Sequence, residues 1–142
     1  MFNKKVWIEG EILAQKYLKN QGYKILDTNV SLSNAEIDII ALASRKLLLK
    51  KLKSEYKSGE LLECSYKACA NNLADTIVFI EVKARSNADF GLPQEAVTLK
   101  KQQHIRRAAQ TYIAQNKLDN MAIRYDIIAV LNGEIEHLEN AF

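Results

Sequence analysis

Two short segments place charged residues inside runs that otherwise read as buried β-strands. They are Glu36-Ile37-Asp38-Ile39-Ile40 and Val78-Phe79-Ile80-Glu81-Val82-Lys83. An unpaired charge is expensive to bury, so two such segments indicate a use for the charges. Because side chains alternate along a strand, Glu36 and Asp38 are expected on one face of the first strand. Ile37 and Ile39 are expected on the other face. The same alternation puts the carboxylate and the ammonium of the second segment on one face.

If the two strands pair, these groups converge at one place, which suits a divalent cation and a phosphodiester. Phosphodiester hydrolysis needs an attacking water and neutralisation of the charge on the phosphate, and a carboxylate-bound Mg²⁺ (or Mn²⁺) supplies both. We therefore expect Asp38 and Glu81 to be metal ligands, together with the backbone carbonyl of Val82. Lys83 is expected to contact the scissile phosphate or to orient the attacking water.

Two further acids are candidates for the same site. Glu36 is expected on the face of Asp38, where it could accept a second metal ion or a water. Glu11 could reach the site if the N-terminal helix packs over the sheet. The alternative for Glu81 and Lys83 is a cross-face ion pair near a strand end, because Glu-x-Lys occurs by chance in many chains. The Glu-x-Asp of a neighbouring apolar strand favours the catalytic interpretation.

The elements that must position these residues follow from hydrophobic periodicity and turn signals. Helices are predicted at residues 5–21 and 98–117, with Gly22 ending the first and Thr98 capping the second. Strands are predicted at 23–32, 35–42, 77–84, 123–131 and 134–138, with a loop at 87–93 and an Asn132-Gly133 hairpin turn. The order α-β-β-β-α-β-β predicts an α/β class, with a central mixed sheet flanked by helices.

Residues 44–77 interrupt this order between the second and third strands. The segment holds seven Lys or Arg residues and four acids, so it carries the whole excess charge of the chain. Three consecutive leucines with flanking lysines predict a short basic helix, and Ser58-Gly59 and Asn71-Asn72 predict turns. We expect a surface insertion. It is either a solvated excursion, as charge runs usually are, or a lysine-rich flap over a nucleic-acid substrate.

Length and composition set the remaining limits. A chain of 142 residues with 48% hydrophobic and 26% charged residues predicts one globular domain over residues 1–142. No apolar run is long enough to span a bilayer and no signal segment is visible, so a cytoplasmic protein without a membrane partner is expected. The net charge of +3 permits nucleic-acid binding without demanding it.

Taken together, the motifs resemble those of the uncharacterised YraN-like protein family. The residues that carry the resemblance are Gly10, Glu11, Ala14 to Leu18, Asn29, Glu36 to Ala41, Phe79 to Arg85, Phe90, Gly91, Pro93, Ala96, Val97, Lys101, Arg124 to Asp126 and Asn140 to Phe142. The resemblance implies the fold of restriction endonucleases and archaeal Holliday-junction resolvases. By that resemblance, Asp38, Glu81 and Lys83 match the PD-(D/E)XK nuclease signature. Glu11 matches an acidic helix position of the resolvases.

The function that this implies is an Mg²⁺-dependent endonuclease of nucleic acid, expected to be DNA, with branched or structured DNA as candidate substrates. A homodimer is compatible with it, since related resolvases need two sites for two strands. Two alternatives stay open: a binder of the same fold that does not cut, and a partner in a repair or processing assembly. Basic residues proposed to position phosphate are Arg85, Lys100, Lys101, His104 and Arg107; a solvated helix face is the alternative. For Arg124 and Asp126 we expect an internal salt bridge.

Overall fold

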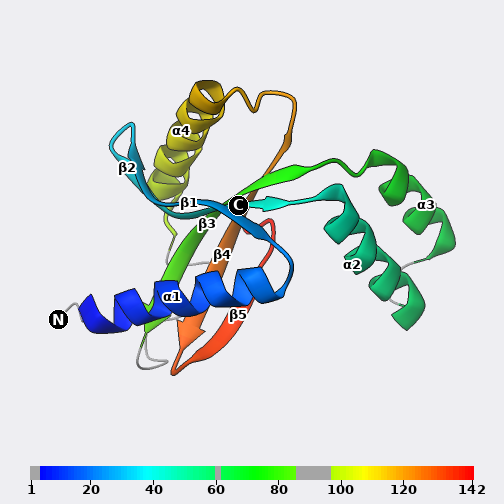
Figure 1. Ribbon diagram of the computed structural model, residues 1–142, viewed down its shortest axis with the longest axis horizontal. Helices are drawn as coiled ribbons and strands as arrows, with labels where there is room; N and C mark the ends of the chain where they lie inside the picture. Colours follow the sequence, from blue (N-terminus) through cyan, green and yellow to red (C-terminus); the bar gives the residue numbers. More distant parts are fainter. Residues whose placement is uncertain (1–3, 60–61, 86–96) are drawn as a thin grey trace.

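A five-stranded mixed β-sheet runs through the molecule in the strand order β1-β2-β3-β4-β5 (Figure 1). The computed structural model describes residues 4–59, 62–85 and 97–142. The elements are α1 (Lys4–Asn20), β1 (Lys24–Leu32), β2 (Ala35–Ala43), α2 (Arg45–Ser58), α3 (Glu63–Asn72), β3 (Thr76–Arg85), α4 (Leu99–Asn116), β4 (Ala122–Leu131) and β5 (Glu134–Leu138). The predicted α/β class with a mixed sheet between helices is confirmed.

Strand β3 occupies the centre of the sheet, as its unbroken apolar run predicts. It pairs antiparallel with β2 and parallel with β4, while the outer pairs β1–β2 and β4–β5 are antiparallel. Residues from Ile77 to Ile80 are at most 1% exposed. Because each fully buried large apolar side chain contributes about 1.5–3 kcal/mol, this strand is a main source of stability.

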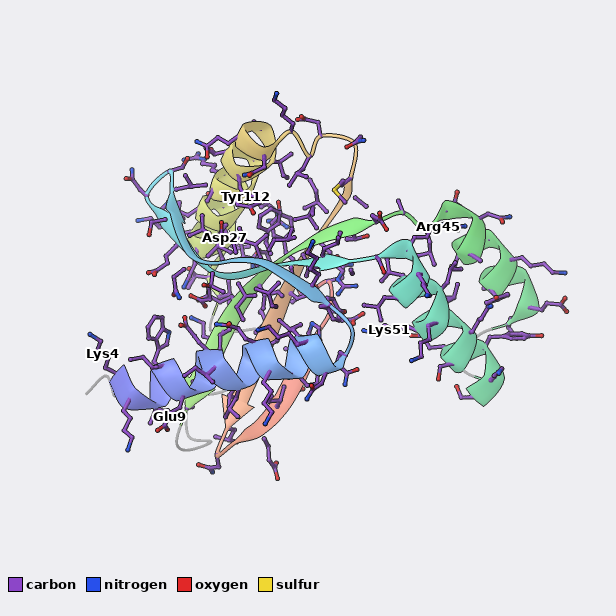
Figure 2. All side chains as sticks on the ribbon, in the orientation of Figure 1. Lys4, Glu9, Asp27, Arg45, Lys51 and Tyr112 are labelled. Atoms are coloured by element: carbon purple, nitrogen blue, oxygen red, sulfur yellow. The ribbon has the colours of Figure 1, made fainter. Side chains whose placement is uncertain are left out.

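Helices α1 and α4 cover opposite faces of the sheet (Figure 1). Ala14 and Leu18 of α1 pack with residues of β2, β3 and β4 in one apolar cluster. Ile105 and Tyr112 of α4 belong to the second cluster, and Figure 2 shows Tyr112 turned toward the sheet. The charged segments identified in the sequence therefore lie in the layer between two helices.

Local sequence signals set the ends of several elements. The Thr98 side chain accepts a hydrogen bond from the backbone N–H of Lys101, so Thr98 caps α4 as predicted. Gly22 follows α1 with a φ of 93°, which few other residues adopt readily. Asn132 and Gly133, with φ of 50° and 84°, form the predicted turn between β4 and β5.

The predicted insertion is a helical hairpin formed by α2 and α3. Its first helix is longer than the three leucines suggested, because Ser44 caps its N-terminus and Gly59 ends it with a φ of 82°. The predicted turn at Asn71 and Asn72 is wrong, because both residues belong to the last turn of α3. The Asn72 amide donates to the carbonyl of Ala68 and stays within the helix.

The hairpin joins the end of β2 to the start of β3 and extends away from the sheet (Figure 1). It therefore begins five residues along each strand from Asp38 and Glu81, and its described residues form no flap over them. The predicted loop at 87–93 lies outside the described residues. Within the described part of the chain, no helix has the length and apolarity needed to cross a membrane.

Candidate active site

Strands β2 and β3 separate at Asp38. Their register ends with Ile39 opposite Ile80, although β3 continues beside β4 as far as Arg85. One residue further, Asp38 and Glu81 would face each other. There the Asp38 carboxylate accepts a hydrogen bond of 2.7 Å from the backbone N–H of Val82. A side chain thus takes the place of a ladder bond, and it brings a carboxylate between two strands.

The neighbouring strand is distorted at the same position. The register of β1 with β2 is the same at Thr28–Ile39 and Val30–Ile37 but lacks a pair between them, where Asn29 has a φ of 51°. The predicted alternation along β2 is wrong here, because Ile37 packs in the cluster under α4 while Ile39 packs in the cluster under α1. Regular pleating cannot give that arrangement, so the backbone is irregular at Asp38.

Glu81 is a buried acid with two lysine partners. Its Oε1 atom lies 2.8 Å from the Lys83 Nζ and also contacts the Lys101 Nζ. The side chain of Glu81 is 3% exposed, whereas those of the two lysines are 23% and 41% exposed. Glu81 Oε2 is buried and has no hydrogen-bond partner among the described residues. One oxygen is thus neutralised and the other is left for a further partner.

Glu11 reaches the site from α1, as predicted. The helix approaches β3 so closely at Gly10 that an added Cβ there would collide with Ala84. Glu11 is buried beside that contact, and its Oε1 atom also has no hydrogen-bond partner in the described part of the chain. Burial raises the pKa of Glu11, a hydrogen bond with Asn29 opposes the rise, and the charge of Glu36 adds to it.

The surroundings of Asp38 disfavour the charged form of its carboxylate. Burial raises the pKa of Asp38 to about 7, and the charge of Glu81 adds to the rise. The hydrogen bond from Val82 opposes it. Three acids, Asp38, Glu81 and Glu11, therefore share the two lysine ammonium groups at Glu81, and a bound cation would offset the remaining repulsion.

The residues offer a hard, oxygen-only donor set. Among the described residues no group of three or more His, Cys, Asp or Glu side chains is arranged to hold a metal ion, so Asp38 and Glu81 are the side-chain ligands to consider. Mg²⁺ commonly binds one or two carboxylates and completes its shell with waters and phosphate oxygens. Val82 N–H points toward β2, and in a strand the C=O of a residue points the same way. The predicted carbonyl ligand therefore faces Asp38.

The remaining predicted residues divide between two surfaces. Lys100, Lys101 and His104 of α4 line a hollow of about 320 Å³ together with Glu36, which is exposed. The exposed Arg107 follows one turn further along α4, outside that lining. Arg85 lines a different hollow beside Gly10, so the structure does not gather the five proposed phosphate contacts on one surface.

Sequence reasoning missed two features of this site. The sequence predicts Lys101 as a phosphate contact and does not show that its ammonium also contacts Glu81, because the approach of α4 to β3 has no local signal. Asn29 was noted only through the resemblance, yet it bonds Glu11 from a left-handed backbone conformation. Asparagine tolerates that conformation better than most residues, which was the available signal.

Comparison with known proteins assigns the chain to a family. It belongs to the uncharacterised protein family UPF0102, whose profile matches residues 10–130. The predicted membership of an uncharacterised, YraN-like family is confirmed. The chain is 42% identical to a UPF0102 protein of Alkaliphilus oremlandii over 99% of both chains. It is 38% identical to a UPF0102 protein of Clostridioides difficile over 100% of both.

Proposed function

We propose that this protein is a divalent-metal-dependent phosphodiesterase of nucleic acid, an endonuclease with a restriction-endonuclease-like arrangement of its sheet and acting on DNA. One observation carries the proposal. Asp38 and Glu81 are buried where β2 and β3 separate, and Glu81 Oε2 has no partner among the described residues. Such groups cluster at functional sites, because a site serving stability alone would satisfy them.

The chain's own residues divide the work. Asp38, Glu81 and the Val82 carbonyl would hold Mg²⁺ or Mn²⁺. The bound ion would supply an activated water and neutralise charge on the phosphate. Lys83 and Lys101 extend from the buried Glu81 toward solvent, so a phosphate can approach their ammonium groups without entering the core. Lys83 is the candidate to orient the attacking water, and Lys101 to hold the phosphate.

Glu11 and Glu36 have supporting roles in this proposal. Glu11, held by Asn29, faces the carboxylates from α1 and could accept a hydrogen bond from a metal-bound or attacking water. Glu36 lies at the exposed rim, where a second cation or a water can reach it. Glu11 would not help a protein that only binds nucleic acid, since a buried acid repels a polyanion.

The test is cleavage by the purified protein in Mg²⁺ and in Mn²⁺. Supercoiled DNA, single-stranded DNA, a four-way junction and a matched RNA serve as substrates. We expect cleavage of a DNA substrate. Asp38→Asn and Glu81→Gln should reduce its rate by on the order of 10² to 10⁴, because both remove ligand charge while keeping side-chain shape. Lys83→Met should cause a smaller loss.

The matched control is Glu134→Gln, which neutralises an exposed acid of β5. It should cut at the rate of the parent protein. Absence of cleavage on every substrate, or equal rates for Asp38→Asn and the parent, would contradict the proposal. Binding without cutting would then support the non-cleaving alternative, and neither binding nor cutting would favour a role as a partner in an assembly.

A further inference from the structure

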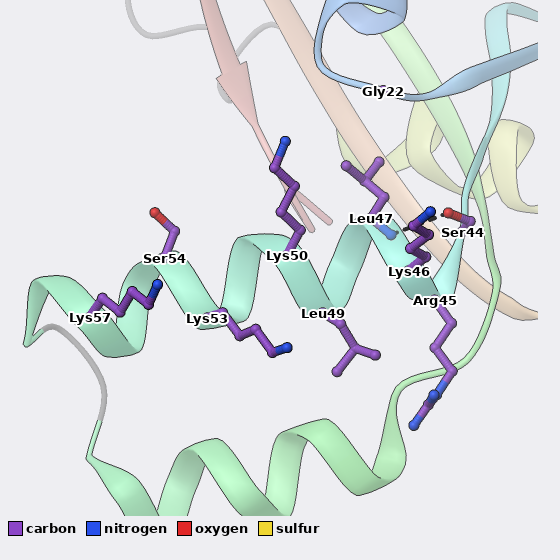
Figure 3. Close-up of a pocket in the computed structure, with 10 residues that line it drawn as sticks. All are labelled: Gly22, Ser44, Arg45, Lys46, Leu47, Leu49, Lys50, Lys53, Ser54 and Lys57. Atoms are coloured by element: carbon purple, nitrogen blue, oxygen red, sulfur yellow. Dashed lines mark hydrogen bonds between the residues drawn. The ribbon is translucent and has the colours of Figure 1, made fainter.

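Four lysines form a continuous stripe along α2. Lys46, Lys50, Lys53 and Lys57 recur at spacings of four, three and four residues. At 100° per residue they fall within an arc of about 60°, over about 16 Å of helix length. All four are exposed and line a hollow of about 790 Å³ beside α2 (Figure 3). We call this row the α2 lysine stripe.

No acidic partner of the stripe is found in the described part of the chain. None of its four lysines forms an ion pair with any residue that the structure describes, whereas Lys51, Lys67, Lys83 and Lys101 are all paired. The one acid of α2, Glu55, lies on the opposite side of the helix from the stripe. Like charges four residues apart destabilise a helix, and Lys46 in the first turn also opposes the helix dipole. An anion along the stripe would relieve both effects.

The hairpin holds the stripe in a fixed orientation. At its base, Arg45 donates to the backbone carbonyls of Leu73 and Ala70 at the end of the hairpin. Near its tip, the rings of Tyr56 and Tyr66 stack with centroids 5.0 Å apart. Lys51 of α2, labelled in Figure 2, forms an ion pair with Glu139 and donates a hydrogen bond to the hydroxyl of Tyr23. Contacts at the base and the tip of the hairpin, together with those of Lys51, therefore fix the position of the row of ammonium groups.

The chemistry of the stripe favours a phosphate backbone over a membrane surface. Interfacial helices insert an apolar face into the lipid, but Leu47 and Leu48 of α2 pack against the core of this protein. Lysine is a flexible point charge without the fork that reads base edges, so a row of lysines contacts phosphates regardless of sequence.

The position of the hairpin sets where on the nucleic acid these contacts fall. Five residues separate Asp38 from the end of β2, which is about 17 Å along the strand. That length corresponds to about five base pairs of duplex at 3.4 Å each. We propose that the α2 lysine stripe binds the phosphate backbone of nucleic acid several nucleotides away from the carboxylate site. This inference rests on the proposed function, because it takes the same substrate and extends the surface that contacts it.

The experiment measures binding without cleavage. Fluorescence anisotropy with labelled duplexes of 8 and 24 base pairs is recorded in EDTA, at sodium chloride concentrations from 50 to 250 mM. The stripe variant carries Lys→Gln at 46, 50, 53 and 57. The matched control carries Lys→Gln at the exposed Lys4, Lys16, Lys19 and Lys24, with the same change in net charge.

We expect the stripe variant to bind the 24-base-pair duplex at least tenfold more weakly than the control variant at 100 mM salt. The slope of log K against log salt is negative, and its magnitude should be smaller by about 3 to 4 in the stripe variant. Each lost phosphate contact reduces that magnitude by about 0.9. On the 8-base-pair duplex, which cannot extend over both the stripe and the carboxylate site, the difference between the two variants should be smaller than on the 24-base-pair duplex. Equal weakening of both variants, unchanged binding by the stripe variant, or binding of the parent to phosphatidylserine vesicles but not to DNA would overturn the proposal.

Failure of the proposed nuclease function would give different results from failure of this inference. A parent protein that binds DNA through the stripe but cuts no substrate retains this inference and loses the nuclease proposal. A stripe variant that still cuts the 8-base-pair duplex in Mn²⁺ at the parental rate separates the two surfaces. Thermal melting checks folding, and the variant should melt no lower than the parent because it loses only repulsion between exposed charges.

Discussion

Two buried aspartates in neighbouring parts of the sheet have opposite environments. Asp38 of β2 and Asp126 of β4 are 6% and 0% exposed. For Asp38, burial and the charge of Glu81 raise the pKa to about 7. For Asp126, burial also raises the pKa, but hydrogen bonds from His137 and Arg124 outweigh it and leave the pKa below its ordinary value.

The difference lies in the partners. Both oxygens of Asp126 are fully used: Arg124 donates to each of them at 2.8 and 2.7 Å, and His137 and the backbone N–H of Asn140 add one bond each. The predicted internal salt bridge is confirmed. Arg124 also bonds Tyr23, and Tyr23 bonds Glu139, so this carboxylate anchors a closed network.

A buried carboxylate with all its hydrogen-bond partners and one without them indicate different roles. Asp126 belongs to a network that holds β4, β5 and the turn after α1 together. Asp38 has one strong donor and two acidic neighbours whose oxygens are partly without partners in the described part of the chain. The contrast separates structural charge from charge that is kept for a ligand.

The largest expected effect comes from removing the charge of Asp126, the structural carboxylate of the pair. Asp126→Asn should lower the free energy of unfolding by about 3–5 kcal/mol, because it leaves the half-buried Arg124 guanidinium with only the exposed Glu139, 3.4 Å away, as a counter-charge. Urea denaturation at pH 7.5 measures the change. Asp38→Asn under the same metal-free conditions should raise the free energy of unfolding, and a loss of similar size there would remove the contrast.

The next effect is a pH dependence of opposite sign at the two aspartates. The folded pKa of Asp38 lies above its unfolded value, so the folded state binds the extra proton and loses stability as pH rises from about 4 to about 7. In EDTA, the parent should lose about 3–4 kcal/mol relative to Asp38→Asn across that window.

Asp126 has a lowered folded pKa, so its contribution is present above pH 4 and is lost only as pH falls further. Urea unfolding of the parent and both Asn variants, at half-unit pH steps, resolves the two trends. If the difference in the free energy of unfolding between the parent and Asp38→Asn stays constant from pH 4 to 8, folding does not raise the pKa of Asp38.

Much of the architecture could be predicted from the sequence because it depends on local signals. An unbroken apolar run located β3, the Thr98 cap located the start of α4, and Asn132 with Gly133 located the last turn. The predictions that were wrong concern features that depend on tertiary contacts. The alternation along β2 broke at Asp38, because its carboxylate bonds the backbone of Val82 in another strand.

The site was predictable in type and only partly in geometry. Asp38, Glu81 and Lys83 stood out because charge is rare in apolar strands, and Glu11 required the close approach that Gly10 permits. The sequence predicts Lys101 only as a phosphate contact, since nothing in the sequence of α4 shows that its first turn meets Glu81. The hairpin was recognised as an insertion, but its direction away from the site depends on where β2 ends.

A smaller effect tests how the site is assembled while leaving the Asp126 network untouched. Gly10→Ala should lower the free energy of unfolding by about 1–2 kcal/mol, because the new Cβ collides with Ala84 and forces α1 away from β3. Ala84→Gly should relieve the clash, so the double variant should be more stable than additivity predicts. Additive effects in urea unfolding would mean that α1 does not depend on this contact.

The smallest effect distinguishes the two aspartates by their response to metal. A ligand that binds only the folded state at ten times its dissociation constant raises the free energy of unfolding by about 1.4 kcal/mol. We expect Mg²⁺ and Mn²⁺ to stabilise the parent in this way at pH 8, where Asp38 is ionised and its repulsion with Glu81 is greatest. Asp38→Asn should respond much less, since it lacks one ligand charge, whereas Asp126→Asn should respond like the parent from its lower baseline. Isothermal titration of Mn²⁺ at the same pH gives the dissociation constant independently of unfolding. Equal metal responses in both variants would place the cation somewhere other than the gap between β2 and β3, and the unpartnered oxygen of Glu81 would then need another explanation.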